Sequence, residues 1–207
     1  MNWRVRVSDT GYDMWNIPEI FSSVHWHASA ASFNMGFIAA AFVCSFHFKT
    51  VVEVGICNGF ITQVLGRAMS ASVGKEGLLV SCDIQEASCN LADNLLRGSY
   101  VSHRYKLLCA DSAKVDWKEH LEGRPIDMAV IDGDHTFEAA SADLNNVGPL
   151  VRHNGIILAH DYAGGHPGVV QAVNLFVSQG GWSLVEVPET GVPAVGYALA
   201  ILQRREK

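Results

Sequence analysis

From residue 50 onward, short apolar runs alternate with segments of helical periodicity, and this alternation constrains the fold more than any other feature. The run 50–55 is rich in β-branched residues, and the next segment places Ile61, Val64 and Leu65 at helical spacing. Near-continuous apolar strands that alternate with helices form a parallel sheet covered on both faces. The runs that we predict as strands are 50–55, 78–83, 105–109, 128–132, 156–160, 182–187 and 195–202.

The last two apolar runs are not separated by a helical segment. Pro188, Gly191 and Pro193 lie between them, a composition typical of a hairpin-like return. The sequence therefore predicts an α/β protein with a Rossmann-like, doubly wound, mostly parallel seven-stranded sheet, helices on both faces and one antiparallel strand. Residues 1–49 are predicted to form an N-terminal helical cap packed on a main domain of residues 50–207.

The composition argues against several partners and compartments. The formal net charge is −6 and no run of Lys or Arg is present, whereas nucleic-acid binders usually carry a basic face. None of the five cysteines forms a CxxC pair, which disfavours a disulfide framework or a zinc site. Residues 1–13 are polar and do not resemble a signal peptide. We therefore expect a cytoplasmic protein without a nucleic-acid partner.

The longest apolar stretch, 33–48, does not predict a membrane span. It is interrupted by Asn34, Ser45 and His47, and it is shorter than the roughly 20 residues that cross a bilayer. We predict a helix that packs in the core or in an interface, so a homodimer formed through this helix is one expectation.

Acidic residues stand at the ends of most predicted strands. In an open parallel sheet, ligands bind at the carboxyl ends of the strands, near the point where the strand order reverses. A carboxylate there is costly in a structural loop and useful in a site that holds hydroxyls, an amine or a metal. The polar residues and glycines at these positions are Glu53, Gly55, Gly59, Asp83, Asp111, Ser112, Asp132, Asp134, His135, His160 and Asp161.

The first of these loops departs from the dinucleotide-binding fingerprint. That fingerprint has the pattern G-x-G-x-x-G, and Cys57 stands where its second glycine would be. The pattern of Glu53, Gly55 and Gly59 resembles instead the first motif of class I S-adenosylmethionine-dependent methyltransferases. That cofactor has no phosphate and carries a sulfonium and an ammonium group, so acidic strand ends suit it.

The resemblance covers roughly residues 50–202 and implies a role for each strand end. It implies that Asp83 binds both ribose hydroxyls, that Asp111 and Ser112 contact the adenine amine, and that residues 50–207 form the cofactor-binding catalytic domain. Helix N-caps stay open as structural roles for Asp83 and Asp111. The cofactor-binding residues that we expect are Glu53, Gly55, Gly59, Asp83, Asp111, Ser112 and Asp132.

Two further motifs, V-I-D-G-D-H-T-F-E at 130–138 and L-A-H-D-Y at 158–162, resemble the metal-assisted small-molecule O-methyltransferases. The resemblance implies that Asp132, His160 and Asp161 hold a divalent metal, with Mg²⁺ as the first expectation. A bound cation would lower the pKa of an acceptor hydroxyl, and His135 would be the catalytic base. His160 stands where several relatives carry an acid, so a softer metal or no metal stays open.

The predicted function is methyl transfer to a small hydroxylated acceptor, such as a sugar, a phenol or a specialised metabolite. Two other functions stay open, a nucleotide-cofactor oxidoreductase and a non-catalytic cofactor-binding scaffold. The missing middle glycine counts against the oxidoreductase, and the acids at most strand ends count against the scaffold. We expect the N-terminal segment and the loops 164–167 and 188–193 to select the acceptor.

Overall fold

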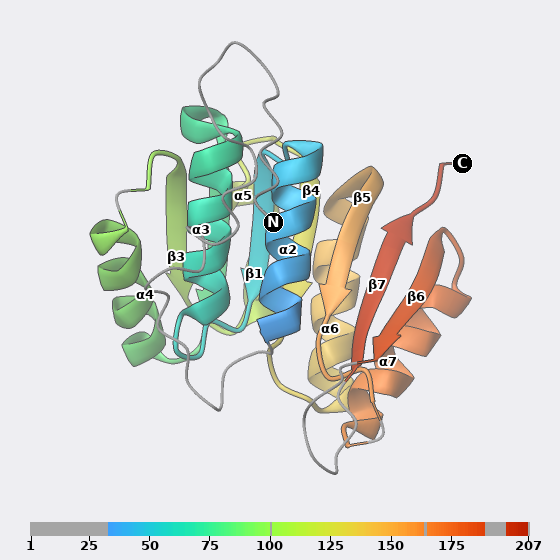
Figure 1. The fold of residues 1–207 in the computed structure, drawn as a ribbon. Helices are drawn as coiled ribbons and strands as arrows, with labels where there is room; N and C mark the ends of the chain where they lie inside the picture. Colours follow the sequence, from blue (N-terminus) through green and yellow to red (C-terminus); the bar gives the residue numbers. More distant parts are fainter. Residues whose placement is uncertain (1–32, 100, 164, 189–197, 207) are drawn as a thin grey trace, which may run out of the picture.

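The computed structural model describes residues 33–99, 101–163, 165–188 and 198–206, which form one sheet with helices on both faces (Figure 1). Its strands are β1 (Thr50–Val54), β2 (Leu78–Asp83), β3 (Arg104–Cys109), β4 (Ile126–Ile131), β5 (Val151–Ala159), β6 (Trp182–Pro188) and β7 (Ala198–Arg204). Their order in the seven-stranded sheet is β3-β2-β1-β4-β5-β7-β6. β7 is antiparallel to both of its neighbours, and the other adjacent pairs are parallel. The predicted fold class, including its one antiparallel strand, is confirmed.

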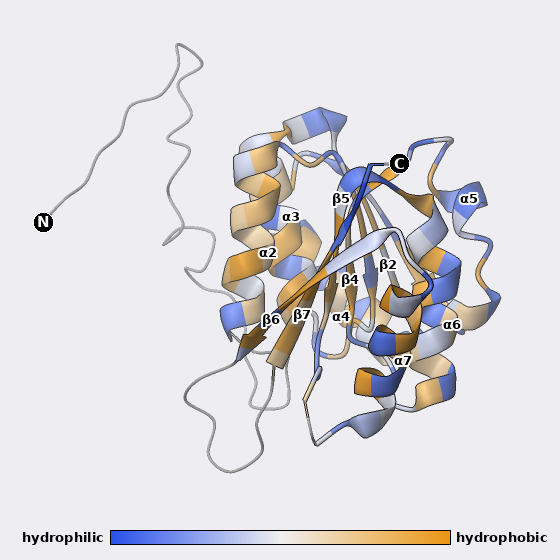
Figure 2. Ribbon diagram, turned by 90° about the vertical axis from the view of Figure 1, so that its right-hand side faces the viewer, coloured by the Kyte–Doolittle hydropathy of each residue, from blue (hydrophilic) through white to orange (hydrophobic). Residues whose placement is uncertain are grey.

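Helices cover the two faces of the sheet, as Figure 2 shows. They are α2 (Phe33–Phe46), α3 (Phe60–Ser72), α4 (Glu86–Gly98), α5 (Trp117–His120), α6 (Phe137–Val147) and α7 (Pro167–Ser178). On one face, Val43 of α2 and Leu65 of α3 belong to one buried apolar cluster. On the other face, Trp117, Leu144 and Phe176 join α5, α6 and α7 in a second cluster. α4 packs beside α3 near the β3 edge of the sheet. The sheet therefore has an apolar core on each face.

The apolar stretch at 33–48 forms α2 and contributes one side to the core. Met35, Ala39 and Val43 are fully buried, whereas the side chain of Phe46 is 60% exposed. A homodimer formed through this helix stays a prediction. Residues 1–32 of the predicted cap, residue 164 and residues 189–197 of the predicted specificity loops lie outside the described residues. Among the helices that are described, none is long and apolar enough to cross a membrane.

Several boundaries differ from the sequence pattern, and β5 differs most, because it begins at Val151 and not at residue 156. The pattern predicts a short helix over 114–120, but α5 begins at Trp117 because the Asp116 side chain caps it, accepting a hydrogen bond from the Lys118 N–H at 3.1 Å. The last predicted strand, 195–202, extends to Arg204, and its described part, Ala198–Arg204, pairs along its whole length with β6. The apolar pattern thus identifies these elements, while a local cap and the strand pairing fix their ends.

Gly55, the residue that follows β1, makes the closest backbone approach at the carboxyl edge of the sheet. Its φ is +90°, and a Cβ at this position would lie 2.0 Å from the carbonyl oxygen of Asp132. Beside this contact, the Gly55 N–H donates to Cys82 at 2.9 Å, and the Asp132 N–H donates to Val54 at 2.8 Å. The loops that follow β1 and β4 are therefore held together where only glycine fits.

We expect Gly55→Ala to lower the free energy of unfolding by at least about 2 kcal/mol. The φ of Gly55 is one that alanine rarely adopts, and the new methyl group would have to displace the backbone of Asp132. Gly98→Ala is the matched control, since Gly98 ends α4 with open space around it and no positive φ, and this change should leave stability unchanged or raise it by up to about 1 kcal/mol. Urea unfolding of both variants measures the difference. Equal effects of the two substitutions would contradict this account of Gly55.

Candidate active site

The carboxyl ends of β1 and β4 lie side by side in the sheet, where the strand order reverses. From β1 the chain moves outward through β2 to β3, and it then returns to β4 on the other side of β1. In open α/β sheets this reversal opens the crevice in which ligands bind. The His160 N–H donates to Ile131 at 3.0 Å and continues the β4–β5 pairing beyond the strands. The loops that carry the predicted site residues therefore meet at one edge.

Asp83, at the end of β2, organises the glycine-containing loop after β1. Its Oδ2 accepts hydrogen bonds from the N–H groups of Ile56 and Cys57, both at 2.9 Å, and its Oδ1 accepts from Gln85 at 2.8 Å. Cys57 has a φ of +51°, a conformation that these bonds stabilise. The carboxylate thus fixes the shape of the loop, and its predicted contact with a ribose stays a prediction.

Glu53 lies inside β1 and is fully buried. Thr62 of α3 donates its hydroxyl to both carboxylate oxygens, at 3.0 and 2.8 Å. Burial raises the pKa of Glu53 to about 7, and the negative charges of Asp132 and Asp83 add to this effect. Glu53 therefore lies beneath the loops of the edge, and its predicted contact with a cofactor stays a prediction.

The loop after β3 is tied to α6 through a carboxylate that the sequence analysis did not select. Asp111 accepts a hydrogen bond from the Ala113 N–H at 3.1 Å and pairs with Lys114 at 2.7 Å. Ser112 donates its hydroxyl at 2.6 Å to Asp143, whose side chain lies on the buried side of α6. Burial raises the pKa of Asp143 to about 6. An acid within the apolar stripe of a predicted helix is the signal that could have identified Asp143.

Two carboxylates and three histidines meet at the ends of β4 and β5. His160 Nδ1 lies 3.1 Å from Asp132 Oδ1 and 3.1 Å from Asp161 Oδ2. His135 Nε2 lies 2.8 Å from the same oxygen of Asp161 and 3.9 Å from Asp132 Oδ1. His166 Nε2 approaches the other oxygen of Asp161 at 3.8 Å. We call these five residues the His/Asp cluster. The structure thus brings together the three predicted metal ligands and the predicted base, and it adds His166.

The electrostatics of the His/Asp cluster follow from these pairings. Hydrogen bonds to Asp132 and Asp161 raise the pKa of His135 to about 10. Burial alone would raise the pKa of Asp161, but hydrogen bonds from His135 and His160 hold it well below its usual range. Without a bound cation, Asp161 is therefore an ionised, buried carboxylate, and His135 carries a proton at neutral pH.

Asp161 has an unusual backbone conformation. Its φ is +56°, in the left-handed region, where aspartate is among the few side chains tolerated. Its side chain is only 6% exposed, and Oδ1 accepts no hydrogen bond within the part of the chain that the structure describes. A buried carboxylate oxygen without a donor is costly unless a cation or another partner binds it.

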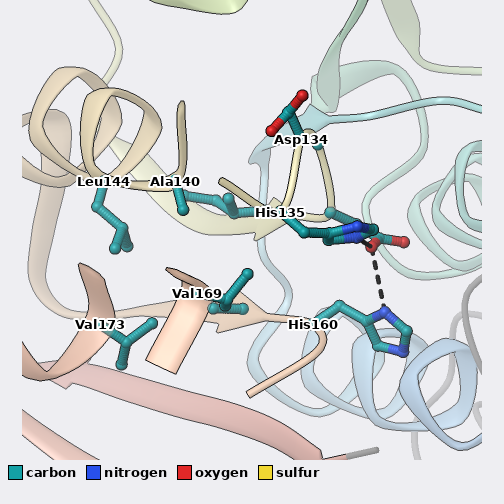
Figure 3. Close-up of a pocket in the computed structure, with 11 residues that line it drawn as sticks. Asp134, His135, Ala140, Leu144, His160, Val169 and Val173 are labelled. Atoms are coloured by element: carbon teal, nitrogen blue, oxygen red, sulfur yellow. Dashed lines mark hydrogen bonds and ion pairs between the residues drawn. The ribbon is translucent and has the colours of Figure 1, made fainter. Parts of the chain in front are cut away.

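The His/Asp cluster borders a pocket between β4, β5, α6 and α7. Figure 3 shows His135 and His160 on one side of this pocket, with Ala140 and Leu144 of α6 and Val169 of α7 around its apolar part. The lining of this pocket is therefore polar beside the His/Asp cluster and apolar beside the two helices.

Together, the strand order, the single antiparallel strand and the acidic carboxyl edge define a class I S-adenosylmethionine-dependent methyltransferase. Residues 52–162, more than half of the chain, match a family model described as a methyltransferase domain. The chain belongs to this methyltransferase domain family and is an enzyme.

Solved structures share the fold at low sequence identity. The O-methyltransferase from Bacillus cereus in complex with SAH has a TM-score of 0.67 and 17% identity, with 91% of this chain and 90% of that chain covered. The O-methyltransferase TomG from Streptomyces achromogenes, involved in tomaymycin synthesis and in complex with SAM, has a TM-score of 0.68 and 17% identity, covering 86% and 82%. An rRNA methylase from Streptococcus thermophilus has a TM-score of 0.62 and 14% identity, covering 82% and 95%. No curated protein sequence matches the chain.

We predict that Glu53→Gln removes a pH-dependent loss of stability. The folded-state pKa of Glu53 is raised from 4.5 to about 7, so its protonated form stabilises the fold below pH 4.5, and this contribution is lost as the pH rises through 7. At pH 8 the variant should exceed the wild type by about 3 kcal/mol in unfolding free energy, and near pH 4.5 the two should agree.

Urea unfolding between pH 4.5 and 8 measures this difference. Gln retains an oxygen that accepts from Thr62, so the packing is preserved. Glu119→Gln, at an exposed position of α5, is the control and should follow the wild-type profile. A constant difference between Glu53→Gln and the wild type across this range would show that the burial of Glu53 has no such effect.

Proposed function

We propose that this methyltransferase transfers the methyl group of S-adenosylmethionine to a hydroxyl group of a small molecule, with a divalent cation at the ends of β4 and β5. The observation that carries the proposal is the meeting of Asp132, His160 and Asp161, whose ligand atoms lie within 4.8 Å of one another. His135 lies directly beside them. The two O-methyltransferases compared above, one bound to SAH and one to SAM, support this proposal.

The charges at the carboxyl edge suit a cationic cofactor. Acids stand within or just after β1, β2, β4 and β5, namely Glu53, Asp83, Asp132, Asp134 and Asp161, and the loops after these strands contain no Lys or Arg within the described residues. Lys114 after β3 is already paired with Asp111. Such an edge would repel a pyrophosphate and attract a sulfonium and an ammonium group. The residues that we assign to the cofactor are Glu53, Gly55, Gly59, Asp83, Asp111, Ser112 and Asp132.

The donor atoms also suit a divalent cation. Asp132, His160 and Asp161 would hold it, and the buried Oδ1 of Asp161 would gain a partner. When bound, such a cation supplies polarisation of the acceptor hydroxyl and lowers its pKa.

His135 is the residue that we assign as the base. Its side chain is 42% exposed, whereas that of His160 is 8% exposed, so His135 is open to an incoming acceptor. Its Nε2 would take the proton of the hydroxyl. Asp132 and Asp161 raise the pKa of His135, and both are assigned to the cation. With the cation bound, they would no longer hold a proton on His135, so its imidazole would be neutral and able to act as the base.

A small molecule is favoured over RNA as the acceptor, although one similar structure is an rRNA methylase. The formal net charge of −6 and the acidic edge disfavour contact with a phosphate backbone. The acceptor class proposed here is a small hydroxylated metabolite.

We expect the protein to bind S-adenosylhomocysteine, and Asp83→Asn to weaken this binding at least about tenfold, because a charged acceptor of hydrogen bonds is lost. Asn retains an oxygen for the Ile56 and Cys57 N–H groups, so the loop after β1 should keep its shape, and only the hydrogen bond from the Gln85 N–H to Oδ1 is lost. Calorimetric titration measures the affinity. Asp116→Asn, which replaces one good helix cap with another, is the control and should bind as the wild type does. Absence of binding by the wild type would refute the assigned cofactor site.

His135→Gln should leave S-adenosylhomocysteine binding within about twofold and lower the rate of methyl transfer at least about 100-fold, since the proton acceptor is lost. The assay supplies S-adenosylmethionine and a panel of hydroxylated metabolites, and it records release of S-adenosylhomocysteine with each. His153→Gln, at an exposed position, is the matched control. A full transfer rate in the His135 variant would assign the base elsewhere.

A further inference from the structure

Asp143 lies beneath the carboxyl edge of the sheet, between the loop after β3 and the loop after β4. It stands on the buried side of α6, beside Leu144 and Val147, and is only 2% exposed. Its Oδ1 accepts a hydrogen bond from the Ser112 hydroxyl at 2.6 Å. On the other side of the carboxylate, a Cβ at Gly133 would lie 3.2 Å from Oδ2. A buried acid therefore lies behind two of the loops to which we assign the cofactor.

The hydrogen bond between Ser112 and Asp143 has only one possible direction. Burial raises the pKa of Asp143 to about 6, which still leaves the side chain ionised at pH 8. An ionised carboxylate only accepts hydrogen bonds, whereas a serine hydroxyl has one proton to donate and two lone pairs that accept. The proton of Ser112 is therefore committed to Asp143. Toward any other partner, Ser112 Oγ is an acceptor only.

The loop after β3 has other contacts that fix its backbone. The Asn146 side chain of α6 donates to the carbonyl of Ala113 at 3.1 Å, one residue beyond Ser112. Asp111 caps the short turn at Ser112–Lys114, where it accepts from the Ala113 N–H at 3.1 Å. These hydrogen bonds attach the loop to α6 and shape it without Asp143. The contact that Asp143 adds is to the hydroxyl of Ser112, so its distinct effect is on the direction of that hydroxyl.

The direction of the hydroxyl matters for a purine ligand. Adenine carries an exocyclic amine, which donates hydrogen bonds, and its deaminated form, hypoxanthine, carries a carbonyl oxygen at the same position, which accepts them. Ser112 is half-buried, with Asp143 on its inner side, so its lone pairs are left for a ligand at the edge. An oxygen that can only accept would bind the amine and would stay unpaired against the carbonyl oxygen.

We propose that Asp143 is a positioning residue that makes the site selective for adenine, because it holds the Ser112 hydroxyl with its lone pairs toward the exocyclic amine of the cofactor. The inference rests on the proposed function, in which Ser112 contacts that amine. Asp143 does not touch the cofactor and acts through Ser112 alone. The selectivity that follows is for S-adenosyl compounds over the corresponding S-inosyl compounds.

The test compares the affinities of S-adenosylhomocysteine and S-inosylhomocysteine by calorimetric titration at pH 8. In the inosyl compound a carbonyl oxygen replaces the amine, and we expect the wild type to bind it at least about tenfold more weakly. The neighbouring ring nitrogen of the inosyl compound also gains a proton. That difference is the same for every variant, so a change in the ratio of the two affinities reports the Ser112 hydroxyl and its partner.

Asp143→Ala frees the Ser112 hydroxyl to turn and to donate to the carbonyl oxygen, so the ratio of affinities should fall at least about fivefold. Asp143→Asn is close to the native side chain in size and serves if the alanine variant does not fold, which circular dichroism checks. Its amide can donate to Ser112 Oγ and release the hydroxyl proton, so the ratio should fall at least about threefold.

Ser112→Ala removes the hydroxyl itself and should lower the ratio at least about fivefold, by weakening the binding of the adenosyl compound. Asn146→Ala is the matched control, because it removes the other side-chain contact between α6 and the loop after β3 but leaves the hydroxyl of Ser112 in place. This variant should keep the wild-type ratio, whatever it does to the two affinities.

An unchanged ratio in a folded Asp143 variant, with both affinities reduced alike, would show that Asp143 only stabilises the loop and would overturn the proposal. Equal affinity of the wild type for the two compounds would overturn it as well, while the proposed cofactor site would stand. Binding of neither compound by the wild type would refute the proposed function, and this inference with it.

Discussion

The contact between Gly55 and the carbonyl oxygen of Asp132 fixes the distance between the two loops on which the site depends. Strands β1 and β4 are neighbours, and their chains leave the sheet at the same edge with no space for a side chain between them. One loop carries the glycines and is held by Asp83; the other carries Asp132 and His135. Any widening at this contact would separate the residues assigned to the cofactor from those assigned to the cation. The chemistry proposed for the edge therefore depends on a steric constraint of the backbone.

Around this contact, the charges divide into two groups. On the β1–β2 side, the carboxyl groups accept hydrogen bonds from backbone N–H groups and a hydroxyl, as with Asp83 and Glu53. On the β4–β5 side, they are neutralised by imidazoles, as with Asp161. Backbone donors cannot leave their carboxylate without a change of loop shape, whereas imidazoles can exchange a proton for a metal. The first side thus has a fixed hydrogen-bonding pattern, and the second provides groups that can change their charge during binding.

The sequence predicted the fold, its single antiparallel strand and the polar residues at the carboxyl ends of the strands, because apolar periodicity reports directly which segments are buried. It did not select Asp143 or assign His166 to the cluster. Asp143 lies eleven positions beyond Asp132 along the chain, and only the packing of α6 brings it to Ser112. His166 lies in a glycine-rich loop whose course depends on the close approach of Gly168 to the loop after β4. Such contacts depend on how helices pack on the sheet, and no periodic pattern records that packing.

Asp161 connects these observations. Its left-handed backbone turns the chain sharply after β5, so that its two oxygens face different histidines, with Oδ2 toward His135 and His160 and Oδ1 toward His166. A bulky or β-branched residue would be strained in this conformation. A single carboxylate therefore joins the loop after β4, the end of β5 and the start of α7. A cation bound to it would act on all three elements at once.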